Sequence, residues 1–204
     1  VDLVGAAQPL RHGAPVHFHA AAAEVEAEVR LLDGAEPLKP GTRGHVRFVL
    51  KDPVLLLPGD RFIIRMFSPV VTIGGGRVLD IAPPQKMNRA ESARRARILE
   101  SGSNEERALL YIRESAYGMG AQELVARTGW MNAEVDAISQ SAKLVSFRQP
   151  RLWMVDREWS VEKLARFRET LKAFHRANPL LPGLSKEELR SRELPGAPPF
   201  LLDA

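Results

Sequence analysis

The sequence predicts a multidomain α+β protein in which an all-β barrel precedes small domains built from helices and a hairpin. Residues 1–83 alternate between apolar and polar side chains, which is the period of strands. The pattern changes to helical spacing at Pro83-Pro84. After that point, short helices lead into a pair of alternating segments. These three observations separate a β part from a mainly helical part.

Five segments of the first part have the alternation of strands with one buried face. They are residues 16–19, 25–31, 45–50, 61–67 and 77–81. Asp-Gly, Pro-Gly and Asp-Pro pairs lie between them and are typical of turns. Because no helical pattern intervenes, we expect residues 1–83 to form a closed barrel or a sandwich.

Helical spacing after residue 84 is divided into short segments. A helix over 87–100, rich in Ala, Arg and Glu, occupies most of a linker at 84–103. Three helices and a hairpin follow, at 104–115, 121–128, 132–142, 144–148 and 152–155. This order is that of a winged helix domain, a variant of the helix-turn-helix. We therefore expect a first winged helix at 104–156.

A second winged helix is expected to begin at residue 157. Its first helix reaches Ala177 and ends there because the residue before Pro179 is disfavoured in the α region. Ser185 and Glu188 have the spacing of a capping box, which opens the next helix. Since the sequence ends at Ala204, before a third helix and wing, we expect 157–204 to be an incomplete second winged helix.

Composition narrows the class of protein. The 204 residues include no cysteine, which excludes disulfides and thiolate metal ligands and fits a cytoplasmic protein. No apolar run approaches the roughly 18 residues that cross a membrane, so we expect no membrane partner. The net charge of +4 arises after residue 84, and basic helices suit an anionic partner such as nucleic acid. A solvated helix face is the alternative interpretation of that charge.

Three consecutive glycines, Gly74 to Gly76, raise the possibility of a phosphate-binding loop. Such a loop leads into a helix and carries a Gly-Lys-Ser/Thr sequence. Here Arg77 and an alternating segment follow, and Gly-Lys-Ser/Thr does not occur. The triplet is better interpreted as a bulge or tight bend at which another backbone approaches closely.

The histidines are the best candidates for metal ligands in this sequence, but the case for a metal centre is weak. His17 and His19 would lie on one face of a strand, and His12 or His45 could add ligands. No carboxylate has a recognisable zinc spacing, so we expect no metal site, although a metal-dependent enzyme remains a rival interpretation. The carboxylates of Glu24, Glu26 and Glu28 share one strand face and suit a solvated barrel exterior. We expect no catalytic residue.

Several stretches resemble the third domain of translational GTPases of the elongation factor Tu kind, and most closely the selenocysteine-specific elongation factors (SelB). The most specific are Gly-Asp-Arg-Phe-Ile-Ile-Arg, ending at Arg65, and Thr-Ile-Gly-Gly-Gly, ending at Gly76. The other stretches are residues 16–19, 27–32, 38–42 and the remainder of 68–80, and residues 175–190 resemble the second winged helix of the family. The resemblance therefore implies a C-terminal fragment of such a factor.

The family resemblance implies delivery of selenocysteyl-tRNA to the ribosome at a recoded UGA codon. GTP and Mg²⁺ would bind in an N-terminal domain that this sequence does not contain, so we expect neither enzyme activity nor a cofactor here. In the family the last winged helices bind an mRNA hairpin, and that contact would lie beyond Ala204. The implied partners are the tRNA, the ribosome and, beyond this fragment, the mRNA hairpin.

The resemblance also implies where tRNA would bind. The third domain of these factors contacts the backbone of the acceptor–T arm, and the contacting regions correspond to Arg43, His45, Arg65 and Ser68. Guanidinium and hydroxyl groups suit phosphates and 2′-hydroxyls, which fix position without reading sequence. The alternative for each is a solvated side chain or an ion pair, such as one between Asp60 and Arg65.

The helix at 132–142 would be the nucleic-acid reader of the first winged helix. Its exposed positions carry little positive charge, which argues against phosphate contact; they are Asn132, Glu134, Asp136, Ser139 and Gln140. We interpret this domain as a spacer or protein-contact module, with Trp130, Leu144, Phe147 and Trp153 in its core. A DNA-binding transcriptional regulator with a β-barrel sensor is the main alternative function, and the acidic helix counts against it.

Overall fold

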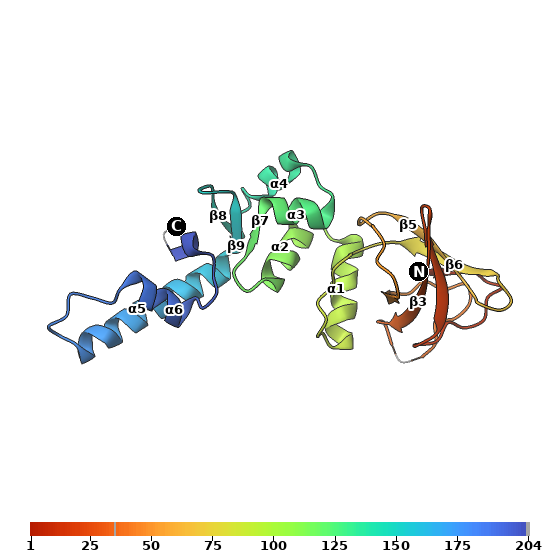
Figure 1. Ribbon diagram of the computed structural model, residues 1–204, viewed down its shortest axis with the longest axis horizontal. Coiled ribbons are helices and arrows are strands. Elements are labelled where there is room, and N and C mark those ends of the chain that lie inside the picture. The colour runs from red at the N-terminus through yellow and green to blue at the C-terminus, as the bar shows by residue number, and fades with distance from the viewer. Residues whose placement is uncertain (35, 203–204) are drawn as a thin grey trace. The chain divides into compact units, whose positions relative to one another are not determined.

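The computed structural model describes residues 1–34 and 36–202, which fall into two compact units (Figure 1). The first unit contains Val1–Ser103, and Arg127–Gly129 group with it. The second contains the remaining residues from Asn104 onward. The predicted linker at 84–103 therefore lies in the same unit as the β part.

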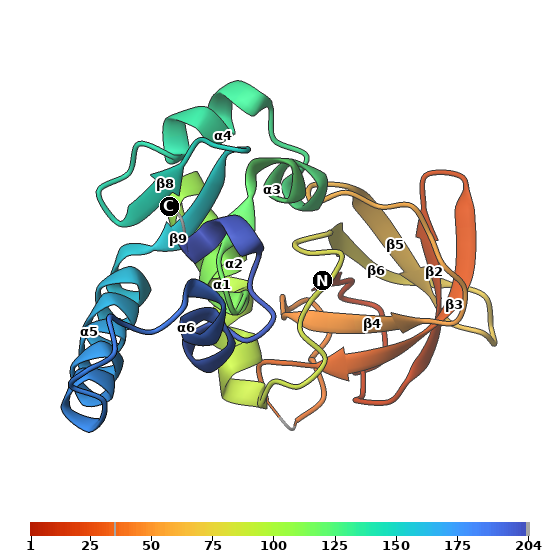
Figure 2. The same ribbon diagram turned by 60° about the vertical axis from the view of Figure 1, so that its left-hand side comes forward.

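The first unit is built on a six-stranded antiparallel sheet in the order β1-β6-β5-β2-β3-β4, whose central strands lie side by side in Figure 2. The strands are β1 (Asp2–Leu3), β2 (Pro15–Ala20), β3 (Ala23–Leu31), β4 (Val46–Leu50), β5 (Arg61–Arg65) and β6 (Thr72–Arg77). The sheet curls back on itself, because Asp2 bridges Arg43 and the Leu3 amide donates to the Thr42 carbonyl at 3.0 Å. The predicted barrel-like fold is confirmed.

Strand periodicity places one face of the sheet in the core. Val16, Phe18, Val29 and Ile64 are each at most 2% exposed. The rings of Phe18 and Phe62 stack with centroids 4.9 Å apart. The residues between these positions face outward, as the alternation predicts.

The glycine triplet lies inside a strand and not at a bend, so that prediction is wrong. Gly74 is opposite Leu3 and Ile64, and Gly75 is opposite Asp2 and Ile63. A Cβ on Gly75 would lie 2.7 Å from the Phe62 carbonyl oxygen, and one on Gly74 would lie as close to the Asp2 carbonyl. The close approach of neighbouring backbones was therefore expected correctly, and the irregularity itself falls between Ile64 and Arg65.

The predicted strand at 77–81 is also wrong, because β6 ends at Arg77. Beyond it, the Asp80 carboxylate accepts from the Ala82 amide at 3.2 Å and pairs with Arg95 at 2.6 Å. Both side chains of that ion pair are less than a tenth exposed. After Arg77 the chain leaves the sheet, and Asp80 then lies where it pairs with the buried Arg95, a charge that needs a partner.

Helix α1 (Arg89–Ser101) corresponds to the helix predicted at 87–100. Asn88 and Glu91 form a capping box at its start. Ala93, Ala96 and Leu99 are buried, since they recur at the spacing of one helix face.

The second unit begins with a winged helix, and the predicted order is confirmed. Its elements are α2 (Asn104–Glu114), β7 (Met119–Gly120), α3 (Ala121–Thr128), α4 (Asn132–Ile138), β8 (Leu144–Phe147) and β9 (Trp153–Asp156). The three strands form one antiparallel sheet in the order β7-β9-β8. Helix α4 is four residues shorter than predicted, because Ser139 turns the chain and its hydroxyl donates to the Asp136 carbonyl.

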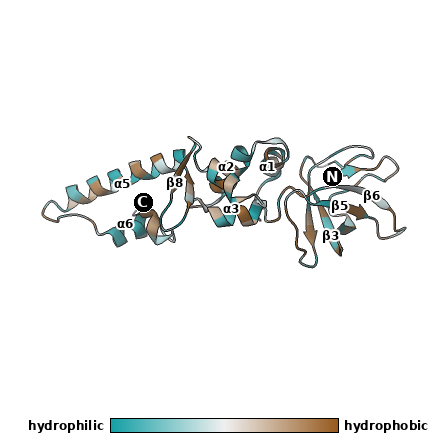
Figure 3. Ribbon diagram, turned by 90° about the horizontal axis from the view of Figure 1, so that it is seen from above, coloured by the Kyte–Doolittle hydropathy of each residue, from teal (hydrophilic) through white to brown (hydrophobic). Residues whose placement is uncertain are grey.

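The last elements are α5 (Arg157–Ala177), α6 (Lys186–Glu193) and the 3₁₀ helix η1 (Pro199–Leu202). Helix α5 has the predicted bounds, and apolar and polar residues alternate along it in Figure 3. The segment after α6 packs on the wing of the first winged helix: the Tyr117 hydroxyl donates to the Pro195 carbonyl at 2.6 Å, and Phe200 meets Trp153 edge to face. Leu194 and Leu201 are buried in the same cluster.

Candidate nucleic-acid interface

Strands β5 and β6 present one outward row each, which we call the β5–β6 face. It comprises Arg61, Ile63 and Arg65 of β5 and Thr72, Gly75 and Arg77 of β6. The alternate residues Phe62 and Ile64 are buried, so the members of this face point away from the core. The face has three arginines and no carboxylate of its own.

Arg65 lies at the end of β5, opposite His17 and Thr72. Its Nη2 donates to the Val70 carbonyl at 3.4 Å, and its buried Nε has no hydrogen-bond partner among the described residues. The anticipated ion pair with Asp60 does not form, because the Asp60 carboxylate accepts from the Leu57 amide at 2.8 Å. Because Nε is buried, only the terminal nitrogens of the Arg65 guanidinium can reach an external acceptor.

Ser68 lies in the loop between β5 and β6 and is exposed. Its neighbour Phe67 packs on the His17 ring with centroids 4.1 Å apart. Val70 and Val71 are about half exposed in the same loop. An exposed hydroxyl therefore follows Arg65 by three residues, in the loop at the end of β5.

Arg43 and His45 lie on the other side of β1 and belong to a network of charges. Arg43 donates from Nε to Asp2 at 2.6 Å, and its Nη1 lies 3.7 Å from the Glu100 carboxylate. His45 contacts Asp33 through Nδ1 at 3.0 Å and Glu100 through Nε2 at 2.8 Å. Arg43 is 67% exposed, whereas the His45 side chain is 16% exposed. His45 thus joins the barrel to α1, and Arg43 faces solvent.

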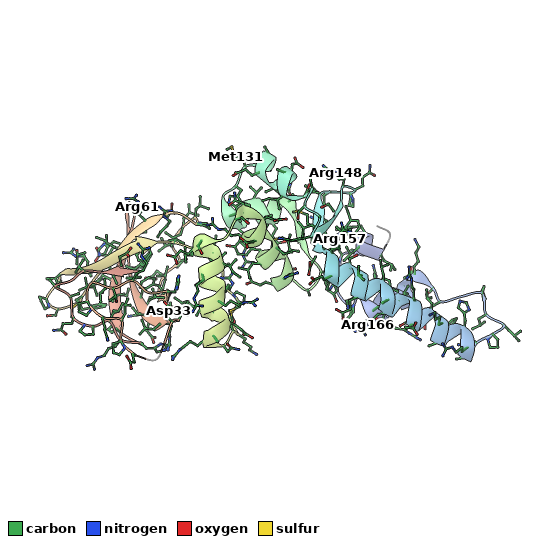
Figure 4. All side chains as sticks on the ribbon, turned by 180° about the vertical axis from the view of Figure 1, so that it is seen from behind. Asp33, Arg61, Met131, Arg148, Arg157 and Arg166 are labelled. Carbon is green, nitrogen blue, oxygen red and sulfur yellow. The ribbon has the colours of Figure 1, made fainter. Side chains whose placement is uncertain are left out.

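The network changes the acidity of its carboxyl groups. The hydrogen bond from Arg43 holds the pKa of Asp2 below its usual value. Burial raises the pKa of Asp33, but hydrogen bonds from the amide and ring of His45 outweigh it, so that pKa is lowered. Figure 4 labels Asp33 in the loop beside α1.

The four predicted contact residues therefore fall into two pairs. Arg65 and Ser68 are three residues apart at the end of β5 and in the loop after it, and Arg43 and His45 share Glu100. Because Arg43 bridges Asp2, which pairs with Gly75, Arg43 lies in line with the β5–β6 face. His45 turns toward α1.

Two residues of this face, Arg61 and Arg77, were not predicted from the sequence as contact residues. They are directly opposite one another on β5 and β6, and both are exposed. The sequence does place each arginine at the end of an apolar or glycine-rich segment. The predicted bend at the glycines interrupted β6, however, so the pairing of Arg61 with Arg77 across the two strands could not be predicted.

The histidines on β2 share one carboxylate. Glu24 lies 3.3 Å from His17 Nδ1 and 3.8 Å from His19 Nδ1. Within the described ranges, no group of three His, Cys, Asp or Glu side chains is placed to hold a metal ion. Nor is any helix in these ranges long and apolar enough to cross a membrane.

Family comparisons match two parts of the chain. Residues 2–85 match the family described as "Selenocysteine-specific elongation factor, beta-barrel domain". Residues 168–204 match "Elongation factor SelB, winged helix". Together the two matches cover more than half of the sequence. The chain belongs to the SelB family.

Curated SelB relatives extend the match along most of the chain. The selenocysteine-specific elongation factor of Desulfomicrobium baculatum is 28% identical over 188 residues, covering 90% of this chain and 30% of the relative. That of Escherichia coli is 25% identical over 201 residues, covering 92% of this chain and 28% of the relative. This chain thus spans less than a third of the length of these relatives.

A solved structure shares the SelB fold. The crystal structure of a bacterial selenocysteine-specific elongation factor, EF-Sec, has a TM-score of 0.63 and 16% identity to this chain. The match covers 95% of this chain and 30% of that one. With this fold and family, a DNA-binding regulator is not favoured.

Several charged side chains of the first winged helix of this SelB chain already have partners. The Glu134 carboxylate accepts from the Met131 amide at 2.8 Å, and Asp136 lies 3.5 Å from Arg148. On the wing, the Arg151 guanidinium lies over the Trp153 ring, 5.2 Å from its centroid. Trp153 and Leu144 are buried and Phe147 packs beside them in the second unit, consistent with core positions.

Proposed function

We propose that this chain helps a selenocysteine-specific elongation factor hold selenocysteyl-tRNA in the cytoplasm. The barrel contacts the tRNA backbone, and the winged helices connect it to mRNA and the ribosome during UGA recoding. GTP hydrolysis belongs to another domain of the factor. Support comes from membership of the SelB family and from the chemistry of the β5–β6 face.

The observation that carries this proposal is the position of Arg65 in the outward row of β5, with the exposed Ser68 three residues later in the following loop. Among the described residues the Arg65 guanidinium pairs with no carboxylate, and its Nη2 donates to the Val70 carbonyl at 3.4 Å. Guanidinium groups bind phosphate oxygens, and hydroxyls bind the 2′-hydroxyl that distinguishes RNA from DNA. Contacts of this kind fix the position of an RNA helix and do not read its sequence.

We propose that the first winged helix is a spacer or a protein-contact module. Phosphate contact requires basic side chains that are available to the ligand. In α4 the half-buried Glu134 and the exposed Asp136 would repel phosphates, and on the wing Arg151 covers Trp153. The wing of this domain also receives the segment that follows α6.

A competition experiment tests the proposed function against the regulator alternative. Fluorescent selenocysteine tRNA is bound to the 204-residue chain and then challenged with unlabelled tRNA or with duplex DNA of equal charge. We expect tRNA to displace the label at a lower concentration than DNA, since only RNA offers 2′-hydroxyls. Displacement by duplex DNA at lower concentrations than tRNA would contradict the proposal.

A further inference from the structure

We propose that Arg61 and Arg77 form a second anion site on the barrel, which binds phosphate groups of an RNA backbone. The site rests on the proposed function, because it names a further contact for the same ligand. Figure 4 labels Arg61 on the outside of the barrel. None of the four residues implied by the family resemblance belongs to this pair.

The two arginines are opposite each other, and no acidic side chain among the described residues neutralises their charge. Arg61 and Arg77 are paired directly across antiparallel strands, an arrangement in which like charges destabilise a sheet. Both side chains are exposed, and neither forms an ion pair or side-chain hydrogen bond with another described residue. Two acids on neighbouring positions are engaged elsewhere: Asp60, which precedes Arg61, accepts from the Leu57 amide, and Asp2, which is opposite Gly75, pairs with Arg43.

A second arginine pair in the same sheet provides the comparison. Arg30 and Arg47 are also directly opposite, on β3 and β4. Arg30 lies 2.9 Å from the Glu28 carboxylate and contacts His12, and Arg47 donates to the Pro84 carbonyl at 3.2 Å. The protein therefore supplies hydrogen-bond acceptors for Arg30 and Arg47. It supplies none for Arg61 and Arg77 among the described residues, so an external anion can act as their acceptor.

The surface beside the pair is open to a polymer. Gly75, two residues before Arg77, faces outward and cannot carry a side chain, because a Cβ would lie 2.7 Å from the Phe62 carbonyl. Along β5, Arg61 lies about 13 Å from Arg65, since each strand residue advances the chain by about 3.3 Å. One RNA strand can therefore contact both arginines while its backbone passes over the glycine.

Phosphate is the anion that this geometry favours. A guanidinium presents parallel N–H donors that match two oxygens of a phosphate. Arg65 lies in the same outward row of β5 and is proposed to contact RNA, so continuity of the face argues for the same ligand at Arg61. An acidic protein segment is the competing occupant and is one outcome of the test.

The test measures salt-dependent binding of an in vitro transcribed selenocysteine tRNA. The variant Arg61→Gln/Arg77→Gln is compared with the wild type and with Arg30→Gln/Arg47→Gln, which removes the same charge from the compensated pair. We expect the first variant to bind at least about tenfold more weakly at about 0.1 M salt. Its plot of log K against log salt should be shallower by about 2, one for each lost phosphate contact. The control should keep the wild-type slope.

Two further readouts separate failure of this site from failure of the proposed function. If the wild type binds tRNA and the Arg61→Gln/Arg77→Gln variant matches it, the site is overturned and tRNA binding stands. If the wild type does not bind tRNA, it is titrated with an unrelated RNA duplex and the amide NMR signals of Arg61, Gly76 and Arg77 are followed. Shifts of these signals would support the anion site, and unchanged signals would overturn it. Thermal unfolding of the variant should be unchanged or higher; a lower midpoint would assign the pair a structural role instead.

Discussion

His45 attaches α1 to the barrel through its ring, which Asp33 holds in place. The Asp33 carboxylate accepts from the His45 amide at 2.6 Å and lies 3.0 Å from its ring, and the ring also reaches Glu100 of α1. A side chain predicted to touch tRNA is thereby given a role in holding the first unit together. Sequence reasoning could not find this, because Asp33, His45 and Glu100 are far apart in the chain and no local pattern links them.

Acid should weaken this attachment. The folded-state pKa of Asp33 lies below the ordinary value of 3.8, so its contribution to the free energy of unfolding is present above that pH. The contribution is lost as the pH falls from 3.8 through the lower folded-state value. We expect Asp33→Asn to lose less stability than the wild type between neutral pH and about pH 3 in urea titrations. The exposed Asp52→Asn is the control, and equal losses in Asp33→Asn and the wild type would contradict the assignment.

At the scale of elements, β6 shows where sequence patterns were sufficient and where they failed. Alternation located β2, β3 and β5, because their apolar residues face one core. Alternation could not identify a strand made of glycines, since a glycine has no side chain to be apolar or polar. It also missed the two-residue strands β1 and β7, which are too short to show a period. The close strand spacing that requires glycine is a tertiary property.

Substitution of Gly75 tests this explanation of β6. An alanine Cβ there would lie 2.7 Å from the Phe62 carbonyl oxygen, so β5 and β6 must separate. We expect Gly75→Ala to lower the free energy of unfolding by about 1–3 kcal/mol in chemical denaturation, as overpacking does. Gly5→Ala is the matched control, because nothing lies within 4 Å of its added Cβ. Equal stability of the two variants would show that β6 tolerates the extra atom.

At the scale of the whole molecule, the family could be identified from the sequence more firmly than any contact residue. The Gly-Asp-Arg-Phe-Ile-Ile-Arg and Thr-Ile-Gly-Gly-Gly stretches pointed to SelB, and the family matches agree. The contact residues depend on which charges the fold has already used. Arg43 and His45 are occupied by Asp2, Asp33 and Glu100, which lie on other elements. Only the fold shows that Arg65 pairs with no carboxylate among the described residues and donates to the Val70 carbonyl instead.

The central claim is that the barrel holds tRNA through Arg65, and a titration of selenocysteine tRNA tests it most directly. Arg65→Ala and Arg43→Ala are compared with Arg11→Ala, an exposed arginine in the loop before β2. We predict that Arg65→Ala weakens tRNA binding roughly eightfold at about 0.1 M salt. The slope of log K against log salt should become shallower by about 1. Arg43→Ala should have a smaller effect, since Asp2 competes for its guanidinium, and Arg11→Ala none. Unchanged affinity and unchanged salt slope in Arg65→Ala would contradict the claim, whatever Arg43→Ala does.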